Sequence, residues 1–468
     1  MNCQFVPHHL LAGKTFLTNN RFAGIHMHIN TTALVLSAGT LIALAVWSGA
    51  QSKHETMKPK RLLIAGAAVV LVLFCFFLLR GPEGRLKLPA GPHAPLVSLG
   101  FSHGLILAPD GSMWSWGGED RGWPVLGLGK INRTANLVRI GSETNWVFVS
   151  AGDAHNLALK SDGSIWAWGA NYRGQLGDGR YGGKLSNGTL NIEHLPVHTV
   201  EGTDWVRVEA GFVTGYALKR DGTLWAWGLN DFGQLGIGSW DDSPTAVPVG
   251  TATNWVKIRA GGVSAAGIQS DGSLWIWGGS PKLGNTTPRS PQDLLVPVRF
   301  TSDTNWLDVS VAFNLWLAVK SDGTLWGWGR NADIFTGASQ DACEIPTQIG
   351  HETDWQSVRS SQGGFYHLLR KRDGAFWIMD ASHDDRSFKL SKVALPPNVV
   401  AWDAGGGAVA AITQDGEVWT CGTILGQSGT VERFVQFLRA GWKVPRTYER
   451  ARIVRERPWQ LRNVDPKD

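Results

Sequence analysis

One eight-residue phrase occurs seven times in this chain and constrains its fold more than any other feature. It reads DGSIWAWG from Asp162, and the other copies begin at Asp110, Asp221, Asp271, Asp322, Asp373 and Asp415. Consecutive copies are 52, 59, 50, 51, 51 and 42 residues apart. A strand-rich unit that recurs at this interval is typical of a propeller or another repeat array.

Each unit predicts antiparallel strands joined by a tight turn. An Asp-Gly pair between two apolar runs is a strong hairpin signal, because both turn positions can take positive φ. After the turn, Trp166 and Trp168 are two residues apart, so both side chains project from one face of a strand. Trp146 stands 16 residues before Asp162, and the same distance recurs in the next three units. Each unit is therefore expected to form an antiparallel sheet.

Small residues recur where the first strand of a unit should end. Residues 151–152 are Ala-Gly, and the pair returns at residues 210–211 and as Gly-Gly at 261–262. This pattern predicts a close backbone approach near a crowded axis. His103 and His155 follow the small pair in two units, but Thr214 and Ser264 take that place in the next two. A position that accepts these replacements favours a structural role over that of a catalytic base.

The second and third units carry a family resemblance. Residues 151–179, AGDAHNLALKSDGSIWAWGANYRGQLGDG, resemble a full repeat of the regulator of chromosome condensation family, and residues 209–238 resemble another. The tryptophan-heavy style is similar to that of bacterial members. The family folds as a seven-bladed β-propeller, and 58 glycines with 24 tryptophans suit such a turn-dense, all-β chain. The resemblance therefore implies a seven-bladed β-propeller over residues 96–468.

The first 80 residues predict a membrane anchor. Residues 33–50 are uncharged and residues 62–79 are far more apolar, and each run has the length of a short membrane-spanning helix. We expect an N-terminal segment at 1–31, one or two transmembrane helices within 32–80, and a proline-rich linker at 81–95. Translation starting at Met27 or Met57 would remove part of this region.

Basic residues set the expected orientation of the anchor. Lys58, Lys60 and Arg61 precede the second apolar run and should remain in the cytoplasm. A hairpin of two spans would also keep this connector inside, so both topologies place the propeller outside. No small-residue cleavage site follows Leu79, which favours an uncleaved anchor over a secreted product. The expected location is a bacterial inner membrane, with the propeller on the extracytoplasmic side.

The search for catalytic chemistry assigns no residue. The aspartate of each repeated phrase is explained by its turn. The chain has no phosphate-cradling loop, nucleophile elbow or Cys/His pair with zinc-like spacing. We therefore predict a protein that is not an enzyme, with no catalytic, cofactor-binding or metal-binding residue. The tryptophans are expected to pack in the core, and an aromatic platform for carbohydrate is the alternative.

Two functions from different classes remain. The first is a membrane-anchored interaction module that binds a protein or a cell-wall partner outside the cytoplasm, as family members that act through protein contacts imply. The alternative is a propeller enzyme acting on polysaccharide, a glycosidase or lyase, which would need paired carboxylates at the channel mouth. The basic stretch at 446–462 is interpreted either as an anion-binding surface or as a solvated segment. Nucleic acid is not expected as a partner outside the cytoplasm.

Two structural predictions complete the analysis. The longest spacing follows the second phrase, and its extra length lies between Gly177 and Pro196. This predicts a loop, with residues 180–192 at its centre, that projects from one face and contacts the partner; a plain disordered insertion is the alternative. Extended segments such as residues 196–199 and 297–300 are expected to begin the following units. The first unit lacks such a segment, so residues 458–461 are expected to complete the sheet built from residues 96–117 and close the ring.

Overall fold

The Asp-Gly turn of each repeated phrase joins the second and third strands of one sheet. In the second unit, Gly163 has a φ of 83°, and a Cβ there would lie 2.0 Å from the carbonyl oxygen of Thr203. Glycine is therefore required both by the backbone conformation and by the adjacent chain. The prediction that these turns form hairpins is confirmed by the antiparallel pairing on either side of them.

The computed structural model describes most of the chain from Leu88 onward, and these residues belong to one compact unit, Arg85–Asp468. The described residues are 88–118, 123–181, 191–279, 288–290, 293–312, 315–330, 332, 342–361, 366–382, 387–393, 395–406 and 408–422. The predicted spans at 33–50 and 62–79 lie outside these ranges. Among the described residues, no helix has the length and apolar character needed to cross a membrane.

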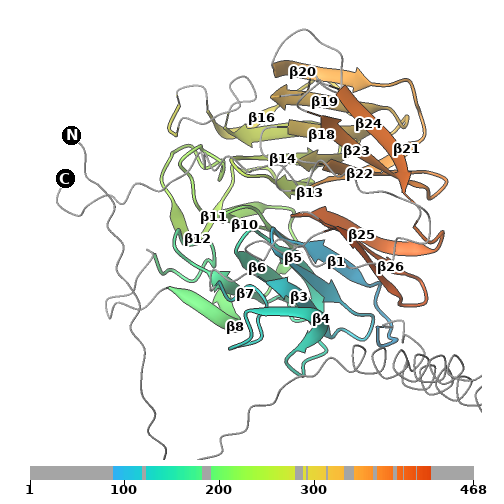
Figure 1. Ribbon diagram of the computed structural model, residues 1–468. Helices are drawn as coiled ribbons and strands as arrows, with labels where there is room; N and C mark the ends of the chain where they lie inside the picture. Colours follow the sequence, from blue (N-terminus) through green and yellow to red (C-terminus); the bar gives the residue numbers. More distant parts are fainter. Residues whose placement is uncertain are drawn as a thin grey trace, which may run out of the picture. The chain divides into compact units, whose positions relative to one another are not determined.

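Seven sheets form an all-β, seven-bladed propeller (Figure 1). The first strands are innermost, because those of consecutive sheets contact one another around the ring. The first strands are β1 (Leu96–Leu99), β5 (Trp146–Ala151), β9 (Trp205–Ala210), β13 (Trp255–Ala260), β17 (Trp306–Val311), β21 (Trp355–Ser360) and β25 (Val399–Gly405). The second strands are β2 (His103–Leu107), β6 (His155–Lys160), β10 (Thr214–Lys219), β14 (Ser264–Gln269), β18 (Leu315–Lys320), β22 (Tyr366–Lys371) and β26 (Ala408–Thr413).

The tryptophan-rich phrases form the third strands, and a fourth strand covers the outside of six sheets. The third strands are β3 (Met113–Gly118), β7 (Ile165–Ala170), β11 (Leu224–Gly228), β15 (Leu274–Gly278), β19 (Leu325–Arg330), β23 (Phe376–Ser382) and β27 (Val418–Gly422). The outer strands are β4 (Arg133–Ile140), β8 (Ile192–Val200), β12 (Ser243–Pro248), β16 (Leu294–Arg299), β20 (Ala342–Ile349) and β24 (Ser387–Val393). In the seventh sheet the described residues supply three strands.

The extended segments after the phrases are outer strands of the same sheet, so the prediction that they begin the next unit is wrong. Residues 196–199 lie in β8, which pairs with β7, and residues 297–299 lie in β16, which pairs with β15. Pairing there satisfies the free edge of the third strand, which would otherwise stay exposed. The sheet that starts with β1 has its own outer strand, β4. The prediction that residues 458–461 complete it is therefore also wrong, and those residues lie outside the described ones.

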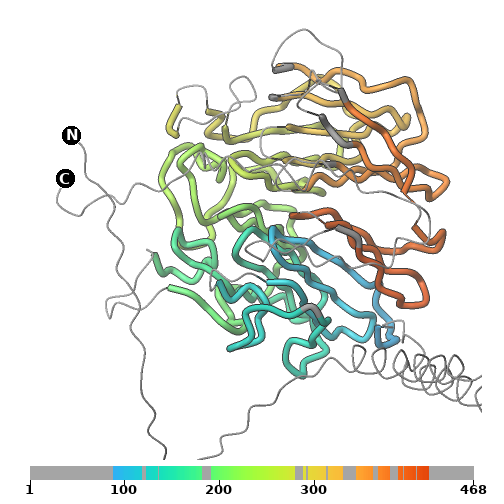
Figure 2. Tube along the Cα trace, viewed as in Figure 1, coloured from blue at the N-terminus to red at the C-terminus, as the bar shows by residue number. Residues whose placement is uncertain are grey.

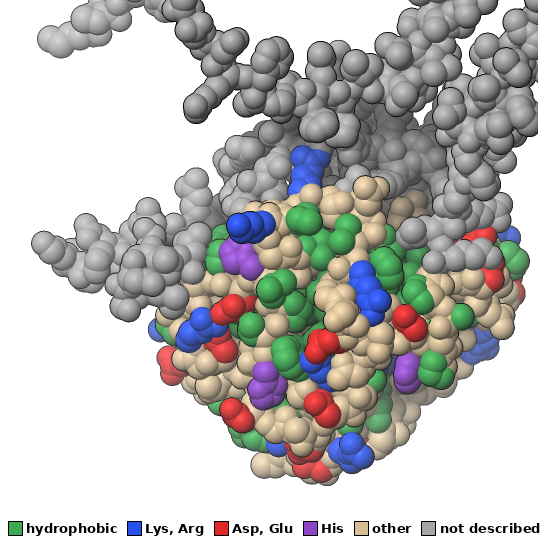
Figure 3. All heavy atoms as spheres, turned by 90° about the horizontal axis from the view of Figure 1, so that it is seen from below, with side chains coloured by type: hydrophobic (Ala, Val, Ile, Leu, Met, Phe, Trp, Pro, Cys, Tyr) green, Lys and Arg blue, Asp and Glu red, His purple; other side chains and the backbone are tan. Residues whose placement is uncertain are grey.

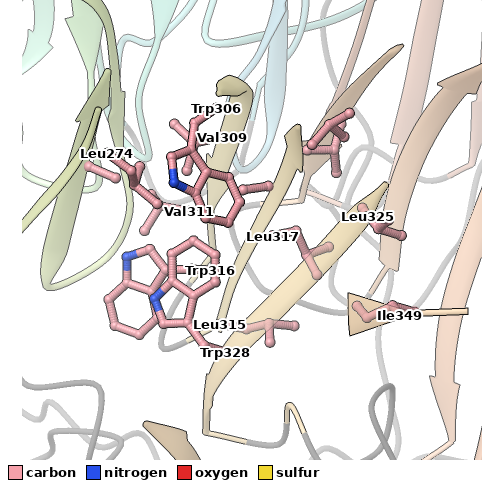
Figure 4. Close-up of a cluster of buried hydrophobic side chains, with 14 of the residues drawn as sticks. Leu274, Trp306, Val309, Val311, Leu315, Trp316, Leu317, Leu325, Trp328 and Ile349 are labelled. Carbon is pink, nitrogen blue, oxygen red and sulfur yellow. The ribbon is translucent and has the colours of Figure 1, made fainter. Parts of the chain in front are cut away.

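The hydrophobic core lies between adjacent sheets and is rich in tryptophan. In the fifth sheet, Trp316 and Trp328 are direct cross-strand partners whose rings stack at 9° with centroids 6.4 Å apart (Figure 4). Leu274 from the fourth sheet belongs to the same cluster, as does Ile349 from β20. A buried tryptophan removes roughly 150–250 Å² from solvent, so these rings dominate the contact between sheets. The prediction that the tryptophans pack in the core is confirmed for this cluster.

The first and last sheets touch directly and close the ring (Figure 2). The backbone N–H of Leu99 in β1 donates to Asp403 Oδ2 in β25 at 2.8 Å. The N–H of Leu88 donates to the carbonyl of Gly416 at 2.9 Å. The predicted backbone crowding near the axis is also confirmed, because a Cβ at Gly152 would lie 2.6 Å from the carbonyl oxygen of Gly211 in the next sheet.

Candidate functional site: the axial surface of the propeller

The aspartates of the repeated phrase are structural acceptors. Asp162 Oδ1 accepts hydrogen bonds from the Ser164 N–H at 2.9 Å and from its hydroxyl at 2.6 Å. The Ser164 Oγ in turn accepts from Trp166 Nε1 at 3.0 Å. These bonds hold the pKa of Asp162 below its usual range. The same bonds recur in four further turns, at Asp110, Asp221, Asp271 and Asp322.

A lysine two residues before the phrase lies against two indole rings. Lys160 Nζ is 3.5 Å from the ring centroid of Trp166 and 4.7 Å from that of Trp146, and it pairs with Glu143 at 2.8 Å. The contact recurs at Lys219, Lys320 and Lys371. We did not predict it from the sequence, although the offset is constant in these units. The lysines occupy indole faces that an aromatic platform for sugars would need open.

Two of the histidines that follow the small pair tie neighbouring sheets together. His103 Nε2 lies 2.5 Å from Asn156 Oδ1, and His155 Nε2 lies 3.2 Å from the carbonyl oxygen of Thr214. Burial lowers the pKa of His103 to about 4 and that of His155 to about 3. Both imidazoles are therefore neutral donors at neutral pH. This geometry supports their interpretation as structural residues.

Six innermost strands contain a β-bulge at the residue after their first one. In each case the pairing register skips that residue, for example between Trp255 and Lys257. We call the six skipped residues the bulge ring; they are Val147, Val206, Val256, Leu307, Gln356 and Val400. Four of them are large aliphatic residues that are 43–51% exposed. Bulges re-aim side chains, and here they turn aliphatic ones outward near the axis.

The bulge ring lies at the end of the propeller that carries the Asp-Gly turns. The N–H of Trp146 donates to the carbonyl of Gly111 at 3.3 Å, and Trp306 bonds Gly272 in the same way at 3.1 Å. The same bond recurs at Trp255 and Trp355, so four innermost strands start beside the Asp-Gly turn of the preceding sheet. We call this end the turn face. This face therefore presents one exposed aliphatic side chain from each of four sheets.

Charged side chains follow the bulges along the same strands. Asp308 accepts bonds from Lys257 Nζ at 2.8 Å, from Arg359 Nη1 at 3.0 Å and from the Val358 N–H at 3.0 Å. Arg259 Nη1 donates to Glu209 Oε2 at 3.2 Å. We call the set the axial charge cluster; its members are Arg207, Glu209, Lys257, Arg259, Asp308, Arg359 and Asp403. It joins five consecutive sheets.

Burial and neighbouring charge shift the pKa values of this cluster in opposite directions. Burial alone would raise the pKa of Asp308, but Arg359, Lys257 and Arg259 hold it below its usual range. Burial raises the pKa of Asp403 to about 6. Burial, and then Arg259, lower the pKa of Arg207. The carboxylates that do converge near the axis are thus engaged: Glu209 and Asp308 with cations, and Asp403 with a backbone N–H.

The base of the loop that follows the second phrase is tied to the third sheet. The Tyr181 hydroxyl donates to Asp242 Oδ2 at 2.7 Å, and Arg173 pairs with both Asp242 and Asp231, at 2.5 Å and 2.8 Å. Residues 182–190 lie outside the described residues. Partner contact by residues 180–192 therefore stays a prediction.

Other described surfaces and clusters offer fewer features of a site. The side of the molecule in Figure 3 shows acidic and basic side chains interspersed with hydrophobic ones. Among the residues that the structure describes, no group of three or more His, Cys, Asp or Glu residues is placed to hold a metal ion. The bulge ring and the axial charge cluster are therefore the candidate site, and sequence patterns had assigned neither.

Comparison with known proteins identifies the repeats. Models described as the regulator of chromosome condensation (RCC1) repeat match residues 146–175, 205–234 and 221–266. The ultraviolet-B receptor UVR8 of Arabidopsis thaliana is 27% identical over 297 residues, which are 60% of this chain and 63% of that protein. The probable E3 ubiquitin-protein ligase HERC6 of Homo sapiens is 32% identical over 145 residues, covering 30% of this chain and 13% of HERC6. The chain thus spans less than two thirds of either relative.

Solved structures share the fold. Yeast RCC1 (Prp20), solved bound to Kap60, superposes with a TM-score of 0.57 at 18% identity, covering 75% of this chain and 84% of that one. Human WBSCR16 gives a TM-score of 0.57 at 16% identity, with coverage of 68% and 86%. The matched repeats and the seven sheets agree with the earlier resemblance. The chain thus carries repeats of the regulator of chromosome condensation family at residues 146–175 and 205–266, on a propeller fold that it shares with these solved structures.

Proposed function

We propose that this chain is a membrane-anchored, non-catalytic interaction module that binds a protein or a cell-wall partner outside the cytoplasm. The observation that carries the proposal is the bulge ring, since four aliphatic side chains are turned to solvent around the axis of a rigid scaffold. Exposed aliphatic residues in such an arrangement favour a partner that covers them. The anchor rests on the apolar run at 62–79 and the basic residues before it.

The axial carboxylates support binding rather than glycosidase chemistry. A glycosidase needs one carboxyl group free to give a proton and another free to attack or to activate water. Glu209 and Asp308 are held in ion pairs, and Asp403 accepts the N–H of Leu99 as part of ring closure. Groups engaged in this way connect neighbouring sheets and are not free for acid-base chemistry.

The orientation of the anchor can be tested with reporter fusions after Leu88. A phosphatase reporter, which folds only outside the cytoplasm, should be active there, and a cytoplasmic fluorescent reporter should be dark. The reason is that Lys58, Lys60 and Arg61 hold their flank inside. The matched control replaces the three basic residues with glutamine, which should raise the fraction of inverted protein. A fusion that is active only when cytoplasmic would overturn the proposed location.

The binding surface can be tested by photo-cross-linking in intact cells. A photoreactive phenylalanine analogue placed at Val256 should give a higher-mass adduct, because this side chain is 51% exposed in the bulge ring. The matched control places the same analogue at Ile345, which is 72% exposed on the outer strand β20. An adduct that muramidase shortens contains a cell-wall partner, and an adduct that muramidase leaves unchanged contains a protein. Equal adducts at both positions, or none at Val256, would argue against the proposal.

A further inference from the structure

The described innermost strands carry one more cation than carboxylate. The cations are Arg207, Lys257, Arg259 and Arg359, and the carboxylates are Glu209, Asp308 and Asp403. Glu209 pairs with Arg259, and Asp308 pairs with both Lys257 and Arg359. Arg207 is the remaining cation. Within the described residues its Nε is buried without a hydrogen-bond partner, and the same is true of Arg259 Nε.

Arg207 is placed at the edge of the bulge ring. It directly follows Val206, the bulged residue of β9, and its guanidinium lies 5.1 Å from the ring centroid of Phe148 on the neighbouring innermost strand. The N–H donors of a guanidinium lie in the plane of the group, so contact with an aromatic ring does not use them. They can therefore still bind an acceptor such as a carboxylate. Burial lowers the pKa of Arg207, and the carboxylates of Glu209 and Asp308 are among the charges that act against this. An anion from outside would further stabilise the charged guanidinium.

We propose that the turn face binds a polypeptide segment that places a carboxylate on Arg207 and aliphatic side chains on the bulge ring. The inference rests on the proposed function, because it takes the partner to be a protein. The exposed Val206, Val256, Leu307 and Val400 side chains supply the apolar contacts. The excess positive charge of the axial charge cluster supplies the complementary attraction. An acidic residue flanked by aliphatic ones fits both features of this surface.

A random peptide library displayed on phage and panned against the full chain in detergent tests the proposal. Enriched peptides should share an Asp or Glu residue next to Val, Leu or Ile. Their affinity for the Arg207→Gln variant should fall about tenfold, the usual effect of losing one charge-assisted hydrogen bond. Arg207→Lys should retain most of the affinity. Arg299→Gln, on the exposed outer strand β16, is the matched control and should change nothing.

The proposal is overturned if no peptide is enriched, if the enriched peptides lack acidic residues, or if they bind Arg207→Gln as well as the unaltered chain. Arg207→Phe guards against misfolding as a cause, because Phe148 holds the equivalent position in the second sheet; this variant should melt like the unaltered chain and still lose the peptides. A cross-link from Val256 that persists in Arg207→Gln would leave the proposed function standing and remove this inference. If peptide binding depends on Arg207 but no cross-link forms in cells, the peptide site of this inference stands and the proposed function does not.

Discussion

Replacing Trp328 with alanine should destabilise the propeller by about 3–5 kcal/mol, the cost of removing a large aromatic side chain from a packed core. Trp328 is fully buried, stacks on Trp316 and also contacts Trp306 and Phe300, with ring centroids 6.2 Å and 5.1 Å away. Its partners come from more than one strand, so the cavity cannot close by a small local shift. The free energy of unfolding from urea denaturation measures the effect.

Ile345→Ala provides the control within the same sheet. Ile345 lies on β20 and is 72% exposed, so its removal should change the free energy of unfolding by less than about 0.5 kcal/mol. Similar losses for the two variants would mean that the tryptophan stack is not a principal source of stability. A smaller denaturant slope in Trp328→Ala would instead indicate that the sheets unfold separately.

Acid should weaken the propeller between about pH 6.5 and pH 3, because three buried histidines gain protons when the chain unfolds. Burial lowers the pKa of His103 to about 4, and those of His155 and His367 to about 3. The stability that they contribute is complete above pH 6.5 and is lost as the pH falls toward the folded-state values. At pH 5 each histidine should cost about 2 kcal/mol.

Asp403 opposes part of this loss. Burial raises the pKa of Asp403 to about 6, so its charged form destabilises the folded state at neutral pH and the penalty shrinks as the pH falls. That gain is about 1 kcal/mol between pH 7 and pH 5. Urea denaturation at the two pH values measures the net effect. His155→Thr, which copies Thr214 of the next unit, should reduce the net dependence on pH by about 40%, because one of three histidine contributions is removed while the opposing contribution of Asp403 remains. An unchanged dependence would contradict the assignment.

The repeated architecture could be predicted from sequence because each turn and each Trp has a local cause. The Asp-Gly pair fixes a hairpin, and the constant distance from Trp146 to Asp162 fixes two strands and a turn. The assignment of the outer strand failed, because residues 196–199 have the same extended pattern whichever sheet they join. Only the free edge of β7 decides the matter, and that is a property of the assembled sheet.

The candidate site was harder to predict, although the spacing of apolar residues at the start of the innermost strands is one sign of the bulges. Trp205 and Val208 are both buried while Val206 between them is exposed. A regular strand would place residues three apart on opposite faces, so this spacing already implies an inserted residue. The axial charge cluster could not be foreseen in the same way. Its ion pairs join residues roughly one repeat apart, such as Lys257 with Asp308, and a sequence read alone does not show which of them face each other.

The bulges also bear on how such a surface can change over generations. A residue in the regular part of a strand must suit both its pairing partner and the sheet beside it, whereas a bulged residue has no direct pairing partner. Val206, Val256, Leu307 and Val400 are therefore freer than their neighbours to mutate without harm to folding. The glutamine at position 356 already departs from the aliphatic majority. Substitutions at the bulges can therefore change the binding specificity of this chain while the fold of the propeller stays the same.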